Sequence, residues 1–234
     1  MNGKIIFIGN TEKRIKEDYL RILRYFRFQS KLESPTWDKE TLVAVKSNAK
    51  GLTQISVERI WQELAKLLVG TSVVDSLAYM NKTGVDSVLG IKTADAKKLN
   101  NYNTDNPVIA LAVLGNDTTL AKKWKLSRAE AYELKFYVTY KDKKVSKEQV
   151  EHMVIDGMEK DLVVNLLKIQ KQDKLASHIE QFDIPTFPVT GNDLIQHDVV
   201  KPGPEMGNVL NKLKDLWKQS NYTASKDELL NVTV

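Results

Sequence analysis

The stretch from residue 14 to residue 28 contains neither glycine nor proline, and it constrains the fold more than any other part of the sequence. At about 100° per residue its apolar side chains gather on one side, which is the spacing of a buried stripe on an amphipathic helix. These apolar residues are Ile15, Tyr19, Ile22, Leu23 and Phe26. The pattern therefore predicts a helix over residues 14–28 that buries this stripe.

A second, polar stripe of the same predicted helix contains Asp18, Arg21 and Tyr25. Asp18 and Arg21 are three residues apart, so their side chains are neighbours on a helix. A carboxylate offers acceptors and a guanidinium offers a planar fork of donors, and together they can match the edge of a nucleobase. The alternative is an intrahelical ion pair worth about a few tenths of a kcal/mol. The spacing alone favours the ion pair, because such pairs are common on helices.

Motifs in and around this helix resemble those of a known family. The run Glu17-Asp18-Tyr19-Leu20-Arg21, within residues 3–28, is similar to the Glu-Asp-x-x-Arg junction of class II tRNA nucleotidyltransferases (CCA-adding enzymes) and bacterial poly(A) polymerases. Residues 55–68 resemble the neck helix of that family, and residues 188–216 resemble its tail. Tyr19 and Leu20 stand where the poly(A) branch typically carries Pro-Val, which favours the CCA-adding branch. The resemblance spans nearly the whole chain.

The resemblance implies roles for particular residues. Asp18 and Arg21 would bind the nucleotide by pairing with the base of the incoming CTP or ATP, and Glu17 and Arg24 would support this template. The RNA partner would be tRNA, and its expected contacts are Arg59, Lys66, Lys201, Gly203, Lys212 and Lys214. For the tail, local geometry alone favours a plainer interpretation, a rigid turn between two helices that begin near Thr190 and Pro204.

The catalytic head of this family carries two carboxylates in Asp-x-Asp spacing that hold two metal ions, and this spacing is absent from the 234 residues. We therefore assign no catalytic residue and no metal ligand, and we expect Mg²⁺ to be bound by a separately encoded head. The expected function is that of the C-terminal template and RNA-binding part of a tRNA nucleotidyltransferase, inactive by itself. The alternatives are a poly(A) polymerase fragment, a non-catalytic RNA-binding remnant of a split gene, and a helical scaffold for other proteins.

The expected fold is all-α, an elongated array of helices with one orphan β-strand over residues 4–8, a run that is apolar and β-branched. Helix starts are predicted at Asn10, Ser56 and Asn106, and at the capping boxes that begin with Ser127 and Ser146. We divide the chain into a head remnant (1–9), a neck with the base template and RNA-binding helices (10–100), a helical body (101–182) and a tail (183–234).

The charge and composition fit a protein that binds RNA. The formal net charge of +5 and the pI near 9.1 are weak evidence alone, because many lysine-rich proteins bind no nucleic acid. The absence of cysteine excludes disulfides and allows a reducing compartment, so we expect a cytoplasmic protein. No apolar run approaches the roughly 20 residues of a membrane span. The three histidines, His152, His178 and His197, lack the spacing of metal ligands.

Overall fold

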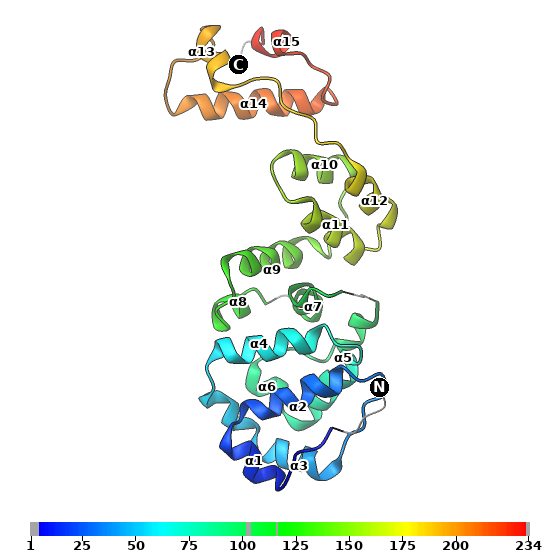
Figure 1. The fold of residues 1–234 in the computed structure, drawn as a ribbon. Helices are drawn as coiled ribbons and strands as arrows, with labels where there is room; N and C mark the ends of the chain where they lie inside the picture. Colours follow the sequence, from blue (N-terminus) through cyan, green and yellow to red (C-terminus); the bar gives the residue numbers. More distant parts are fainter. Residues whose placement is uncertain (1–4, 102–103, 116, 233–234) are drawn as a thin grey trace. The chain divides into compact units, whose positions relative to one another are not determined.

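The computed structural model describes residues 5–101, 104–115 and 117–232, and all the regular secondary structure in these ranges is helical. The expected all-α fold is therefore confirmed. The chain divides into two compact units, which are best followed along the colours of Figure 1. Unit 1 comprises residues 1–144 and 168–172, and unit 2 comprises residues 145–167 and 173–234. The four functional parts named above stay a prediction.

Unit 1 is a stack of mostly short helices (Figure 1). In chain order these are α1 (Thr11–Glu17), α2 (Leu20–Ser30), α3 (Lys39–Asn48), the 3₁₀ helix η1 (Ala49–Gln54), α4 (Val57–Leu68), α5 (Val73–Thr83), α6 (Val85–Leu89), the 3₁₀ helix η2 (Ala96–Asn101), α7 (Pro107–Leu114), α8 (Thr119–Lys123) and α9 (Arg128–Tyr140). Helix α2 lies against α4 and α5, and α7 lies between α4 and α9.

Most predicted helix starts are confirmed by their capping hydrogen bonds. The Asn10 side chain accepts from the backbone N–H of Lys13 at 2.8 Å, and Asn106 accepts from Val108 at the start of α7. Ser127 begins α9 with a complete capping box, as predicted. Ser56 precedes α4 at the predicted place, but its side chain makes no capping hydrogen bond. These starts were predictable because each cap is a contact between residues within one turn of each other.

The apolar stripe of the first predicted helix is part of the core of unit 1, where Ile15, Ile22, Leu23 and Phe26 are fully buried and Tyr19 is half-buried. The helix itself is not continuous, so the prediction of one helix over residues 14–28 is wrong. Asp18 has an extended backbone, with φ −156° and ψ 103°, and it separates α1 from α2. The break is stabilised locally, because the Asp18 carboxylate accepts a hydrogen bond from the backbone N–H of Leu20 at 3.1 Å.

The strand expected over residues 4–8 is not formed by residues 5–8, and Lys4 lies outside the described residues. A strand needs a neighbour to satisfy its backbone N–H and C=O groups, and the described part of the chain offers no other strand. The segment instead stacks the Phe7 ring on Tyr25, with ring centroids 5.8 Å apart. Ile8 is left 89% exposed.

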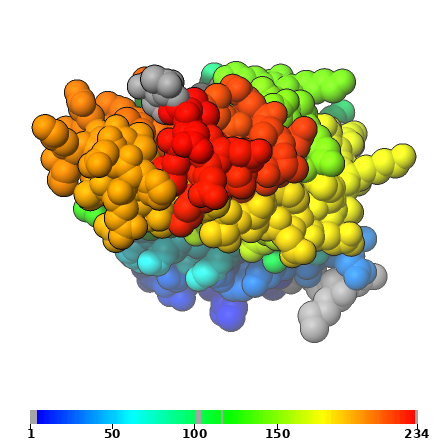
Figure 2. Space-filling model, turned by 90° about the horizontal axis from the view of Figure 1, so that it is seen from above, coloured from blue at the N-terminus to red at the C-terminus, as the bar shows by residue number. Residues whose placement is uncertain are grey.

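Unit 2 contains the remaining helices, α10 (Lys147–Ile155), most of α11 (Lys160–Ile169), α12 (Asp173–Gln181), α13 (Gly191–Gln196), α14 (Glu205–Gln219) and α15 (Lys226–Leu230). The capping box at Ser146 begins α10 as predicted. Helices α13 and α15 both pack on α14, and Figure 2 shows them side by side on one face, in orange and red. Their shared core is built around Leu194, Leu213, Trp217 and Leu229.

Candidate nucleotide-base and RNA interface

The break between α1 and α2 sets the position of Asp18. Its carboxylate is anchored by one oxygen, Oδ1, which caps Leu20. The other oxygen, Oδ2, lies 3.4 Å from Nη2 of Arg59 on α4 and 3.8 Å from Nη1 of Arg24 on α2. About a quarter of the Asp18 side chain, 24%, is exposed. A carboxylate held in this way is oriented by the protein and remains open to a ligand.

Arg21, the second residue predicted for the template, pairs with Glu17 rather than with Asp18. Its Nη1 lies 2.8 Å from Oε2 of Glu17 and donates to the backbone carbonyl of Arg14, also at 2.8 Å. The hydrogen bond from Arg21 lowers the pKa of the Glu17 carboxyl. The intrahelical Asp18–Arg21 ion pair, which the spacing alone favoured, is therefore not the arrangement in the structure. The helix break turns the Asp18 carboxylate towards α4 instead.

Arg14, Arg21 and Arg24 line a pocket of about 260 Å³ together with residues 5–8, Tyr25 and Phe28. Three guanidinium groups and three aromatic rings, those of Phe7, Tyr25 and Phe28, thus surround one space. Guanidinium groups bind phosphate and stack on planar rings, and aromatic faces stack on nucleobases. The pocket has the chemistry to receive a nucleotide beside the exposed part of Arg21.

Helix α4 supplies the predicted RNA contacts of unit 1. Arg59 is half-exposed and lies at Asp18, so the structure brings this residue to the template. Lys66 is exposed and follows Arg59 by seven residues, or about two turns, on the same side of α4. The structure thus places Arg59 at the template and Lys66 further along the same helix.

The tail residues predicted to contact tRNA differ in their exposure and in the bonds that they already make. Lys201, Gly203 and Lys212 are exposed. The Lys214 ammonium is already engaged, because it donates to the backbone carbonyl of Ile155 at 3.0 Å and lies 2.9 Å from Oδ1 of Asp156. Lys214 therefore ties α14 to the end of α10 and does not present a free ammonium.

The turn that resembles the family's tail motif is built by hydrogen bonds around Asp193. Thr190 begins α13 with a capping box to Asp193, and Pro204 immediately precedes α14, so both expected helix starts are present. The Asp193 carboxylate accepts from the backbone and hydroxyl of Thr190 and pairs with Lys226 at 2.9 Å. These bonds, Thr190 first, lower the pKa of Asp193 to about 2. These contacts tie the start of α13 to Lys226 at the start of α15.

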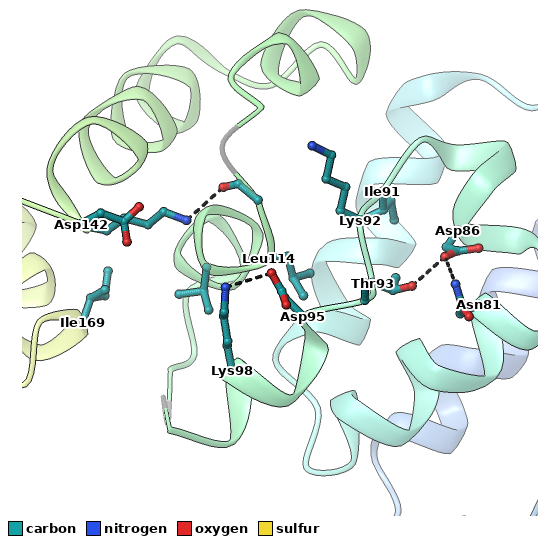
Figure 3. A pocket seen from close by; sticks show the side chains of 14 residues that line it. Asn81, Asp86, Ile91, Lys92, Thr93, Asp95, Lys98, Leu114, Asp142 and Ile169 are labelled. Atoms are coloured by element: carbon teal, nitrogen blue, oxygen red, sulfur yellow. Dashed lines mark hydrogen bonds and ion pairs between the residues drawn. The ribbon is translucent and has the colours of Figure 1, made fainter.

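A larger pocket of unit 1, about 630 Å³, contains none of the predicted site residues. Figure 3 shows Asp86 holding Asn81 and Thr93, and Lys98 paired with Asp95. Its lining carries three lysines and three aspartates, namely Lys92, Lys98, Lys141, Asp86, Asp95 and Asp142. Charge in this pocket is balanced, so its electrostatics do not select an anion such as phosphate.

Two residues at the template were not predicted. Glu63 on α4 is a buried carboxylate beside Arg24 and Arg27. Gly51 packs against the ring of Tyr19 so closely that a Cβ at position 51 would lie 2.1 Å from the ring. Glu63 did leave a signal in the sequence, a charge on the apolar side of a helix, three residues after Ile60 and one before Leu64. No sequence pattern indicates the contact between Gly51 and Tyr19, because the two residues are 32 positions apart along the chain.

Among the described residues, no group of three or more His, Asp or Glu side chains could hold a metal ion. Within the same ranges, no helix combines the length and apolar character needed to cross a lipid bilayer.

Comparisons with known proteins agree with this architecture. Residues 36–89 match the family model described as the probable RNA and SrmB-binding site of polymerase A. The mitochondrial CCA tRNA nucleotidyltransferase 1 of Danio rerio is 36% identical, over 98% of this chain and 58% of the relative. The CCA-adding enzyme of Ligilactobacillus salivarius is 30% identical, over 98% of this chain and 62% of the relative. The chain thus spans about three fifths of the length of these relatives.

Solved structures show the same fold. The Bacillus stearothermophilus CCA-adding enzyme in complex with CTP aligns with a TM-score of 0.73 at 23% identity, covering 93% of this chain and 61% of that chain. The Thermotoga maritima CCA-adding enzyme complexed with tRNA aligns with a TM-score of 0.60 at 18% identity, covering 94% and 61%. Together, these comparisons support the class II CCA-adding family, and the chain is similar to the C-terminal part of its members.

Proposed function

We propose that this chain supplies the base-reading template and the RNA-holding surface of a tRNA nucleotidyltransferase that adds CCA to tRNA 3′ ends. The observation that carries the proposal is the break at Asp18. It leaves a carboxylate and the guanidinium of Arg21 each about a quarter exposed, the latter beside a pocket lined by further arginines and aromatic rings. Relatives that align over nearly the whole chain carry this activity in their names.

In this proposal the two template residues read the base, and other groups hold the triphosphate. Asp18 accepts hydrogen bonds from the base edge while Oδ1 stays on Leu20, and Arg21 donates while Glu17 keeps its guanidinium in place. A hydrogen bond to a charged partner contributes about 1.5–3 kcal/mol. The choice between bases therefore depends strongly on these two side chains. The overall affinity for a nucleoside triphosphate depends on them much less.

Nucleotidyl transfer itself is assigned to a head that holds Mg²⁺, because the described residues do not fit a metal site. The tRNA is assigned to Arg59 and Lys66 in unit 1 and to Lys201, Gly203 and Lys212 in unit 2, all of them exposed or half-exposed. Solved relatives in complex with CTP and with tRNA support both kinds of ligand. We further propose the cytoplasm as the compartment, although the relatives include mitochondrial as well as bacterial enzymes.

The test is the nucleotide preference of an active enzyme assembled from this chain and a nucleotidyltransferase head. Asp18→Ala and Arg21→Ala should each lower the preference for CTP and ATP over UTP and GTP by about ten- to a hundredfold, with tRNA affinity nearly unchanged. The matched controls are Asp95→Ala and Lys98→Ala, which break an exposed pair with the same three-residue spacing. Wild-type preferences in both template variants would refute the proposal.

A further inference from the structure

Glu63 is the least exposed carboxylate near the template, and the proposed function gives it no task. Its side chain, on α4, is 9% exposed. It lies between two arginines of α2, with Oε1 3.4 Å from Nε of Arg24 and Oε2 3.1 Å from Nη1 of Arg27. Burying a charge is costly unless it is paired, so this carboxylate must hold its arginines for the fold to tolerate it.

Arg24 connects Glu63 to Asp18, because its guanidinium group approaches both carboxylates. Arg24 uses Nε towards Glu63 and Nη1 towards Asp18, at 3.4 Å and 3.8 Å. The planar fork of arginine has enough donors to face two carboxylates at once. Arg59 approaches Asp18 from α4, four residues before Glu63, so one side of α4 supplies both constraints. The orientation of the template acid is therefore fixed from α4.

Releasing Arg24 would change what Asp18 offers a ligand. The side chain of Arg24 is long and 42% exposed, so Glu63 is what keeps its fork divided between two partners. Without Glu63, the fork would be free to turn and form a two-bond pair with Asp18, which is the favoured geometry of arginine with a carboxylate. The acceptors that the proposed template needs would then be occupied from within the protein.

We propose that Glu63 is a positioning residue that holds Arg24 away from full pairing with Asp18 and thereby keeps the template acid available to the base. This inference rests on the proposed function of Asp18. Glu63→Gln removes the charge and keeps the shape, and it should lower nucleotide preference by about five- to tenfold with little change in tRNA affinity. The matched control is Glu58→Gln, which removes an exposed carboxylate of the same helix, paired with Lys125.

A second variant covers the case in which Glu63→Gln does not fold, since Arg27 would lose its partner. Arg24→Gln leaves Glu63 on Arg27 and removes the link to Asp18. Because the proposed harm comes from Arg24 pairing with Asp18, this variant should lower the preference less than Glu63→Gln does. A loss of about tenfold or more in Arg24→Gln would overturn the inference, since Arg24 would then support Asp18 rather than compete for it. Adding Arg24→Gln to Glu63→Gln should then restore much of the preference that Glu63→Gln loses.

Two measurements decide the inference. The Nε–H NMR signal of Arg24 should be protected from exchange in the wild type and in Glu58→Gln, and should lose protection in Glu63→Gln. Nucleotide preference is then measured in the enzyme assembled with a head. Unchanged protection in Glu63→Gln overturns the inference whatever the function of the chain. Lost protection with wild-type preference also overturns it, provided that Asp18→Ala changes the preference. If Asp18→Ala has no effect, the proposed function has failed first and this inference fails with it.

Discussion

The arginines around Asp18 and the lysines of the tail carry the same charge and are used in opposite ways. Around Asp18, Arg24 and Arg59 contact carboxylates and yet remain nearly half-exposed. In the tail, Lys218 is 8% exposed and Lys214 is bound to a backbone carbonyl, and both pair with Asp156. A guanidinium has enough donors to bind a carboxylate and a ligand at once, whereas a buried ammonium uses its donors in bonds within the protein. Counting positive charge therefore does not locate an RNA contact.

The largest expected effect on stability comes from comparing a tightly packed glycine near Asp18 with a loosely packed glycine in the tail. Gly51→Ala places a Cβ 2.1 Å from the Tyr19 ring next to the template, and the ring must move. We expect a loss of about 2–3 kcal/mol in the free energy of unfolding, measured by urea denaturation. Gly203→Ala in the tail is the control, since its nearest atom would be 3.9 Å away, and it should change stability by less than about 0.5 kcal/mol. Equal effects would show that Tyr19 is not tightly seated.

Removing one carboxylate from each region tests the charge comparison itself. Asp156→Asn removes the negative charge that lies 2.7 Å from the buried Lys218 ammonium and should cost about 1–2 kcal/mol of stability. Asp18→Asn leaves two half-exposed arginines in water and should cost less than about 0.5 kcal/mol. Thermal unfolding of both variants measures the difference. A larger cost at Asp18 than at Asp156 would contradict the comparison.

Neighbouring lysines of α14 should respond differently to the same substitution. Lys212→Ala removes an exposed ammonium and should reduce the salt dependence of tRNA binding by about one phosphate contact, a log–log slope of roughly 0.7–0.9. Lys214→Ala should leave that slope unchanged and instead lower stability, because Lys214 bonds the end of α10. Fluorescence anisotropy over a range of salt concentrations measures the slope. The reverse pattern would mean that Lys214 contacts RNA.

The smallest expected effect is a loss of stability at acidic pH. The folded-state pKa of Asp193, about 2, lies below the ordinary value of 3.8, so its contribution to stability is fully present above about pH 4. That contribution should disappear as the pH falls towards 2. Asp193→Asn should therefore be less stable than the wild type at pH 6, and the two should converge near pH 2. A gap that stays constant with pH would show that the carboxylate charge is not what stabilises the turn.

The sequence predicts the helices better than it predicts the site, because the two depend on different distances along the chain. Caps such as Ser127 with Glu130 act within one turn and can be found by inspection. The break at Asp18 does not follow from the apolar spacing, which continues across it, and the contact of Asp18 with Arg59 joins residues 41 positions apart. The strand was overpredicted because a strand is defined by its neighbour. The resemblance predicted Glu17 and Arg24 as supports of Asp18 and Arg21, but not the contact of Arg59 with Asp18.

The seat of Tyr19 on Gly51 also has an evolutionary consequence. A side chain at position 51 and a tyrosine at position 19 exclude each other, since the ring occupies the space of the missing Cβ. Among relatives these two positions should covary, with any residue other than glycine at 51 accompanied by a smaller side chain at 19. A change at position 51 would then be accessible to evolution only after position 19 had changed, so the order of the two substitutions is itself constrained.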